Sequence, residues 1–138
     1  MDLDSTTQSV RDAVGVAGIV GASHDAFARV LLALRAIEDP RSDLFSAFVM
    51  ASALAANGRD ALRFASSLVS CDLEKPLGDA PNPGLAMESV PEMASLCQLL
   101  ATRLDAAAET AVQAEDREAC RESGRCAHEM AALLGGEP

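Results

Sequence analysis

Apolar residues recur every three or four positions along most of this chain. The pattern is clearest in residues 23–38, in residues 59–71 and from residue 89 to residue 134. Because an α-helix turns once in about 3.6 residues, this spacing gathers the apolar side chains on one face of a helix. The pattern predicts an all-α protein, built as a compact array or bundle of five to six helices.

The segment 42–57 differs from the others because apolar residues lie on several of its sides. Residues 44–56 include no charged side chain, and Asn57-Gly58 follows as a signal that ends a helix. A helix that is apolar nearly all round is normally surrounded by neighbours. We therefore expect 42–57 to be the central helix. The side chains expected in the core or in an interaction surface are Phe27, Phe45, Phe48, Met50 and Phe64.

Residues 5–22 are compatible with either a helix or a strand. Ser5 is a suitable N-cap for a helix over residues 5–20. Three glycines at three-residue spacing weaken that helix, and the β-branched residues between them also suit a strand. These glycines are Gly15, Gly18 and Gly21. The next helix is expected to begin at Ser23.

Proline and glycine concentrate in residues 75–88. A segment of this composition and length predicts a loop. We expect it to join an N-terminal helical part, residues 1–74, to a C-terminal helical part, residues 89–138. The whole chain, residues 1–138, is then a single helical domain.

The C-terminal part begins with a pattern typical of a helix start. Ser89 and Glu92 are spaced as a capping box. Helical spacing continues to residue 134, and one helix of that length would extend about 67 Å. That exceeds the size of a compact domain of this mass, so we expect a break near Thr110–Asp116 or at Ser123-Gly124.

Composition and charge exclude several classes of partner. The 138 residues and 14.3 kDa suffice for one domain. The net charge of −10 argues against DNA or RNA as a partner, because phosphate binding requires a cationic face. The chain starts with acidic residues, and the apolar stretch 13–22 is too short to cross a bilayer. We expect a cytoplasmic protein with no membrane span.

Alanine has a further consequence for partners. The chain has 27 alanines, which favour helices and let them approach closely. Because alanine supplies little burial, such a bundle leaves apolar surface for a protein partner or for a homo-oligomer.

Four cysteines are the main candidates for chemistry: Cys71, Cys97, Cys120 and Cys126. Their spacing fits no Cys-x-x-Cys or zinc-finger motif, so we expect reduced, structural thiols. A soft-metal site would have to draw on Cys97, Cys126 and Met130. Residues 120–130 resemble the cysteine-bearing helices of four-helix copper-storage proteins, although those helices carry many more cysteines. That resemblance implies copper binding as an alternative.

No catalytic or cofactor-binding residues emerge from the sequence. His24 is expected to lie exposed at a helix start beside Asp25, and His128 on the polar side of the last helix. No serine lies in a nucleophile elbow, and no glycine-rich phosphate loop is present. We therefore expect a protein that is not an enzyme and that holds no cofactor.

Residues of about 23–72 resemble a degenerate tetratricopeptide repeat. Ala28, Leu32 and Pro40 match the end of one such repeat, and 51–65, around Asn57-Gly58-Arg59, matches the following hairpin. The resemblance implies helix hairpins that are stacked into a concave surface able to hold a peptide or a helix.

These observations lead to three hypotheses of function. The first is a helical protein–protein interaction module, an adaptor or chaperone-like subunit that binds a partner chain or itself through apolar helix faces. The second is the soft-metal (copper or zinc) or thiol-redox protein. The third is a small-ligand pocket or an enzyme within a helical bundle, lined by Phe45, Phe48, Met50 and Phe64.

Overall fold

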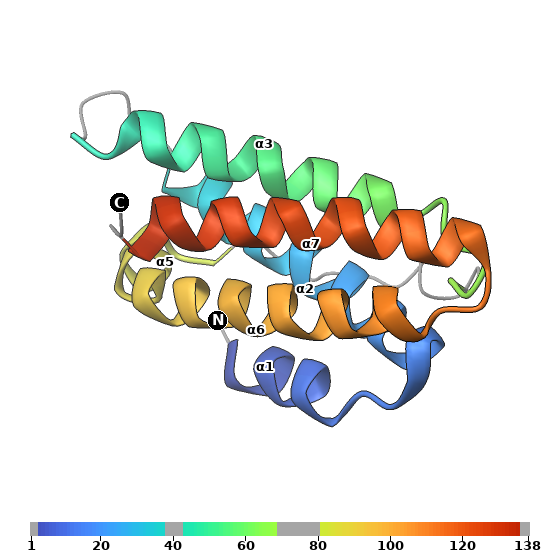
Figure 1. Cartoon of the computed structure of the whole chain (residues 1–138). Coiled ribbons are helices and arrows are strands. Elements are labelled where there is room, and N and C mark those ends of the chain that lie inside the picture. The colour runs from blue at the N-terminus through green and yellow to red at the C-terminus, as the bar shows by residue number, and fades with distance from the viewer. Residues whose placement is uncertain (1–2, 38–42, 69–80, 136–138) are drawn as a thin grey trace.

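The computed structural model describes residues 3–37, 43–68 and 81–135, and within these ranges every regular element is an α-helix (Figure 1). The prediction of an all-α protein, a compact helical array, is confirmed. The helices are α1 (Leu3–Asp12), α2 (Gly15–Ala36), α3 (Phe45–Leu62), α5 (Pro83–Glu88), α6 (Val90–Thr110) and α7 (Ala114–Gly135).

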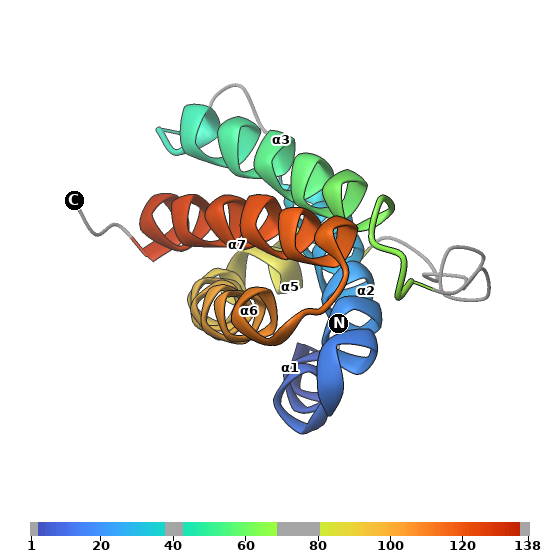
Figure 2. The same cartoon turned by 45° about the vertical axis from the view of Figure 1, so that its right-hand side comes forward.

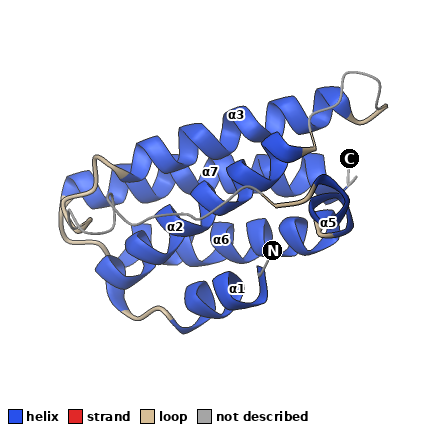
Figure 3. Ribbon diagram, turned by 180° about the vertical axis from the view of Figure 1, so that it is seen from behind, coloured by secondary structure: helices blue, strands red, loops and turns tan. Residues whose placement is uncertain are grey.

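The four long helices pack side by side. Helix α7 lies between α3 and α6 and contacts both, and α2 packs against α3 and α6 (Figures 1 and 2). The short helix α1 contacts α2 and α6, and from behind α2 runs between α3 and α1 (Figure 3). Helices α2 and α3 of the N-terminal part therefore share one core with α6 and α7 of the C-terminal part.

Residues 5–22 are helical, with a break after Asp12. Helix α2 begins at Gly15, whose φ of 76° is a left-handed conformation that glycine adopts without strain. The Arg103 side chain donates a hydrogen bond to the carbonyl oxygen of Ala13 beside this break. The expected helix start at Ser23 is wrong, because Ser23 is fully buried inside α2.

Helix α2 is the most enclosed helix of the bundle. Eleven of its 22 residues are buried, among them Phe27, Val30 and Leu34. By length and composition α2 is also the one described helix that could cross a membrane, and 56% of its most apolar window is buried inside the fold. The core helix of a folded bundle meets the same two criteria, so they do not place α2 in a membrane.

The end of α3 and the extent of its burial both differ from what the sequence predicted for the segment 42–57. First, it does not stop at Asn57-Gly58 but continues to Leu62, because Gly58 is in contact with the ring of Phe27. Second, neighbours cover one face of α3 and not nearly all of it. The buried residues are Phe48, Ala51, Ser52, Ala55, Gly58 and Leu62. The absence of charged side chains in residues 44–56 therefore does not mark burial on all sides.

The helix expected over residues 59–71 is wrong beyond Leu62. Residues 63–68 form successive turns, with hydrogen bonds such as Ala65 N to Leu62 O at 3.1 Å. Residues 69–71, with Cys71, lie outside the described residues. The side chain of Asp116 on α7 binds these turns at the backbone of Ser67, as shown below.

The loop expected at 75–88 contains a helix at its end. Helix α5 starts after Asn82, whose side chain accepts a hydrogen bond from Gly84 N at 2.8 Å, and Pro83 occupies the first turn. Ser89 lies between α5 and α6, and its hydroxyl donates to Leu85 O at 2.9 Å. The Ser89 side chain therefore does not form the expected capping box.

The break between α6 and α7 falls at residues 111–113, as one of the two predictions for this region stated. The other position, Ser123-Gly124, lies inside α7. Gly124 faces α6, where a Cβ would lie 2.8 Å from Oδ1 of Asp105. The glycine therefore allows α6 and α7 to approach closely instead of interrupting the helix.

The described helices show no evidence of tetratricopeptide-like repeats. Such repeats would need helix starts near residues 23, 42 and 59, whereas α2 starts at Gly15, α3 starts at Phe45 and residue 59 lies inside α3.

Candidate functional site

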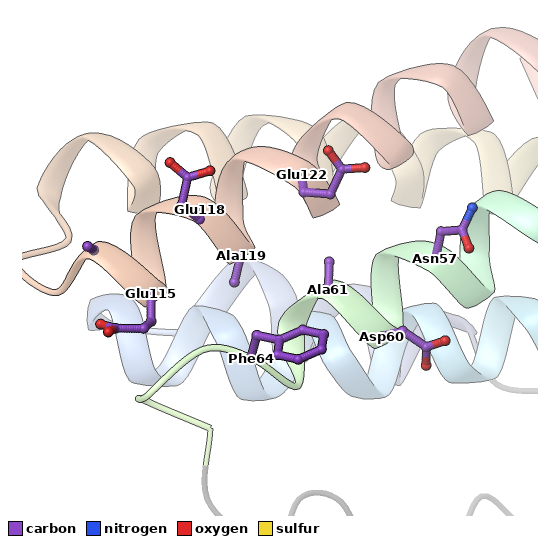
Figure 4. A pocket seen from close by; sticks show the side chains of 9 residues that line it. Asn57, Asp60, Ala61, Phe64, Glu115, Glu118, Ala119 and Glu122 are labelled. Carbon is purple, nitrogen blue, oxygen red and sulfur yellow. The ribbon is translucent and has the colours of Figure 1, made fainter.

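A groove of about 780 Å³ runs between the C-terminal half of α3 and the N-terminal half of α7 (Figure 4). The two helices are neighbours in space although about fifty residues separate them in the chain. The groove is lined by Asn57, Asp60, Ala61, Phe64, Ala114, Glu115, Glu118, Ala119 and Glu122. Small apolar side chains form its base, and carboxylates line it on both sides.

Phe64 is the largest apolar side chain in this groove and is 79% exposed. It follows the end of α3, where the chain turns toward α7 (Figure 4). An aromatic ring left this open to water gains almost none of the free energy that its burial would release, which is about 1.5–3 kcal/mol. The ring is therefore available to a partner.

Asp116 holds the turn that follows Phe64. Its side chain accepts hydrogen bonds from Ser67 N at 3.0 Å, from Ser67 Oγ at 2.6 Å and from Ser66 Oγ at 3.5 Å. Asp116 is buried, with 4% exposure, and a buried carboxylate needs such donors to offset its lost hydration. These bonds fix residues 66–67 against the first turn of α7 and so position the end of the groove.

The charged side chains that line the groove are all acidic, and their cationic partners lie beside it. Arg59 is 3.4 Å from Asp60, and Arg121 is 3.8 Å from Glu118. The structure gives Glu115 no ion pair within residues 3–37, 43–68 and 81–135. The groove therefore attracts positively charged groups.

Arg125 is the cation bound most closely to these carboxylates. It lies 2.5 Å from Glu122 and 2.7 Å from Glu129. The hydrogen bond from Arg125 is the main reason that the pKa of Glu122 lies below its ordinary value. Glu122 is therefore ionised at neutral pH and already paired, whereas Glu115 has no ion pair in the described part of the chain.

The chemistry of the groove follows from the side chains that line it. It is lined by carboxylates, one amide and apolar groups, with no histidine, cysteine, serine or lysine. Within the described part of the chain, no three side chains of His, Cys, Asp or Glu are grouped to hold a metal ion. The arrangement provides hydrophobic contact and attraction of cations.

The five residues predicted for the core or an interaction surface divide into two groups. Phe27 and Phe48 are buried in the core, at 0% and 2% exposure. Phe45 is half-buried, whereas Met50 and Phe64 are exposed. Of the four residues expected to line a small-ligand pocket, only Phe64 lines this groove, so the pocket hypothesis is wrong as stated.

The cysteines that the structure describes are buried, free thiols: Cys97, Cys120 and Cys126. Burial raises the pKa of Cys97 to about 12 and that of Cys120 to about 11, with a smaller contribution from Asp116 to Cys120. Burial also raises the pKa of Cys126. Since the thiolate is the form that attacks electrophiles, burial lowers the reactivity of these thiols at neutral pH.

The two histidines occupy different environments. His24 is buried within α2 and not exposed at a helix start, because α2 begins nine residues earlier, at Gly15. His128 is exposed on α7, as expected, and its Nε2 lies 2.9 Å from Oδ2 of Asp105 on α6. Neither histidine lies in the groove.

Comparison of the chain with protein families, with curated proteins and with solved structures found no match. The groove and the glutamates that line it were not predicted from the sequence. The available signal was their spacing of three and four residues, Glu115, Glu118 and Glu122.

Proposed function

We propose that this protein is a helical protein–protein interaction module, an adaptor or chaperone-like subunit of the cytoplasm. It binds a partner chain, or a second copy of itself, through the outer face of α3. The observation that carries this proposal is the exposure of large apolar side chains along that face and directly after it. Val49 is 38% exposed, Met50 is 56% exposed and Phe64 is 79% exposed.

Two of these side chains lie on the exposed side of α3, and the third follows the helix. At about 100° per residue, Val49 and Met50 are about 100° apart around the axis of α3, and Phe64 lies in the turn after its last residue, Leu62. The opposite side of α3 is buried against α2 and α7. Methionine and phenylalanine are enriched in interfaces, and methionine adapts to partners of different shape.

The position of Met50 and Phe64 outside the core supports a role for them in binding a partner. The core is filled by other residues, so Met50 and Phe64 add little to the stability of the isolated chain. Burial of each in an interface would release about 1.5–3 kcal/mol, which is a large part of the free energy of a typical complex.

The test compares two exposed positions, one on the outer face of α3 and one on a different helix. A photo-cross-linking amino acid is placed at Met50 on α3, or at Gln98 on α6, which is exposed on a polar surface. We expect adducts with a defined partner or with a second copy from position 50 and none from position 98. The mass in solution should then exceed 14.3 kDa or include the partner.

In the chain without a cross-linker, Met50→Glu should lower the mass in solution to that of the monomer, 14.3 kDa, and leave the fold intact, because the Met50 side chain is exposed. A strictly monomeric protein with no adduct from position 50, or with equal adducts from both positions, contradicts the proposal.

A further inference from the structure

We infer that the groove between α3 and α7 holds a cationic amphipathic segment of a partner protein. This inference rests on the proposed function and specifies the chemistry of the partner. An apolar residue of the segment packs on Phe64 at the end of the groove. Lys or Arg side chains of the segment lie along the carboxylates of α7.

The carboxylates are arranged as such a segment requires. Glu115, Glu118 and Glu122 are three and four residues apart and so lie on one face of α7 (Figure 4). Cationic side chains on one face of a partner helix recur at the same spacing. A row of them can therefore pair with the row of glutamates on α7, whether the partner helix runs parallel or antiparallel to α7. Asp60 adds a carboxylate from the α3 side of the groove.

The cations of this chain leave part of that charge uncompensated. Arg125 is shared between Glu122 and Glu129, and Arg121 lies 3.8 Å from Glu118. Neither arginine lines the groove, and Glu115 has no ion pair in the described part of the chain. A cationic ligand therefore gains attraction at Glu115 without first displacing a cation of this chain.

The base of the groove supplies the apolar contact. Ala61 and Ala119 face each other across it with minimal side chains, which leaves room for a side chain of the ligand beside Phe64 (Figure 4). Phe64 is held in place by the turn that Asp116 binds. An exposed aromatic ring beside a pocket with a charged rim is the usual arrangement of an interface anchor.

Charge also decides between the candidate occupants of this groove. A second copy of this chain carries the same net charge of −10 and would bring further carboxylates against Glu115 and Glu118. Nucleic acid and anionic lipid are repelled for the same reason. The cationic segment of a different protein is the occupant that the charge favours.

The test uses a defined probe and the full chain. The probe is a fluorescein-labelled amphipathic helical peptide, with a row of leucines on one face and lysines on the other. The matched peptide carries glutamate in place of every lysine. Fluorescence anisotropy should show binding of the lysine peptide alone. Its affinity should fall as salt rises from about 0.1 M to about 1 M, because the Debye length falls from about 10 Å to about 3 Å.

Two variants of equal charge locate the binding site. Glu115→Gln with Glu118→Gln removes two carboxylates of the groove, and the dissociation constant should rise by about two- to fivefold for each. Glu92→Gln with Glu109→Gln removes two exposed carboxylates of α6 that do not line the groove, and the dissociation constant should stay unchanged. Phe64→Ala should weaken binding about tenfold or more through loss of the anchor.

Equal binding of the two peptides overturns the inference, because the positive charge of the ligand would then not matter. Equal weakening by the two double variants also overturns it, because the carboxylates of the groove would then contribute no more than other surface carboxylates. Adducts from position 50 together with no peptide binding overturn the inference and leave the proposed function standing. Peptide binding at the groove with no adduct from position 50 contradicts the proposed role of the outer face of α3.

Discussion

The ring of Phe27 on α2 lies directly against the backbone of Gly58 on α3. A Cβ built on Gly58 would lie 2.7 Å from Cε1 and 2.8 Å from Cζ of that ring, which is closer than side-chain atoms normally approach. Phe27 is fully buried. The pair therefore sets how closely α2 and α3 pack, and it explains why a glycine is found in the middle of a helix.

Gly58→Ala should destabilise the protein even though alanine is the better helix former. Overpacking a filled core costs about 1–3 kcal/mol, which exceeds the gain of about 1 kcal/mol from helix propensity. The matched control is Gly18→Ala in α2, where the nearest atoms to a Cβ are 3.9 Å away. Gly18→Ala should raise the free energy of unfolding in urea, and Gly58→Ala should lower it. If Gly58→Ala instead raises the free energy of unfolding, α2 and α3 can move apart without loss of stability.

Phe48→Ala should lower the free energy of unfolding by about 3–5 kcal/mol, because it removes a buried ring at 2% exposure and leaves a cavity. Phe64→Ala removes the same atoms from a position that is 79% exposed and should change stability by less than about 0.5 kcal/mol. Urea denaturation of the two variants compares them directly. Similar losses in both would mean that Phe64 is packed in solution.

Asp116→Ala should destabilise the protein by about 1–3 kcal/mol, because it leaves Ser67 N and the Ser67 hydroxyl without their acceptor. Ser67→Ala removes one of these donors and should cost less. Hydrogen exchange at the amide of Ser67 should become faster in Asp116→Ala. Unchanged protection of that amide would show that Asp116 does not hold the turn.

The buried thiols predict how stability depends on alkaline pH. Burial raises the pKa of Cys97 from 9.0 to about 12, so the folded chain keeps this thiol neutral while the unfolded chain loses its proton above pH 9. The stabilisation is fully present below pH 9 and is lost as pH rises toward 12, by up to about 1.4 kcal/mol per pH unit. The chain has no tyrosine, and the thiols of Cys120 and Cys126, whose pKa burial also raises, add to the same dependence.

Cys97→Ala should flatten that pH dependence of the free energy of unfolding, measured in urea between pH 8 and about 10.5. The same burial predicts that iodoacetamide modifies Cys97 slowly in the native protein and rapidly in urea. Stoichiometric copper or zinc in protein purified without chelators, lost on alkylation of the thiols, would instead support the soft-metal alternative.

Much of the fold could be predicted because it depends on local pattern. The period of apolar residues indicated the long helices, and the length limit of a compact domain predicted a break in the last segment, at one of two positions. The limits of α3 could not be predicted, since Asn57-Gly58 is a stop signal in isolation and becomes a contact with Phe27 in the bundle. The exposed side of α3 was missed for a related reason, because uncharged residues such as Val49 and Met50 look the same whether water or protein covers them.

Helical class, the acidic net charge and core residues such as Phe27 and Phe48 follow from the amino-acid sequence alone, because each depends on residue type and spacing. The groove does not. It exists because α3 packs beside α7, and because Asp116 binds the turn after Phe64, two relationships between residues some fifty positions apart. Only tertiary packing decides which carboxylates and which apolar side chains meet there.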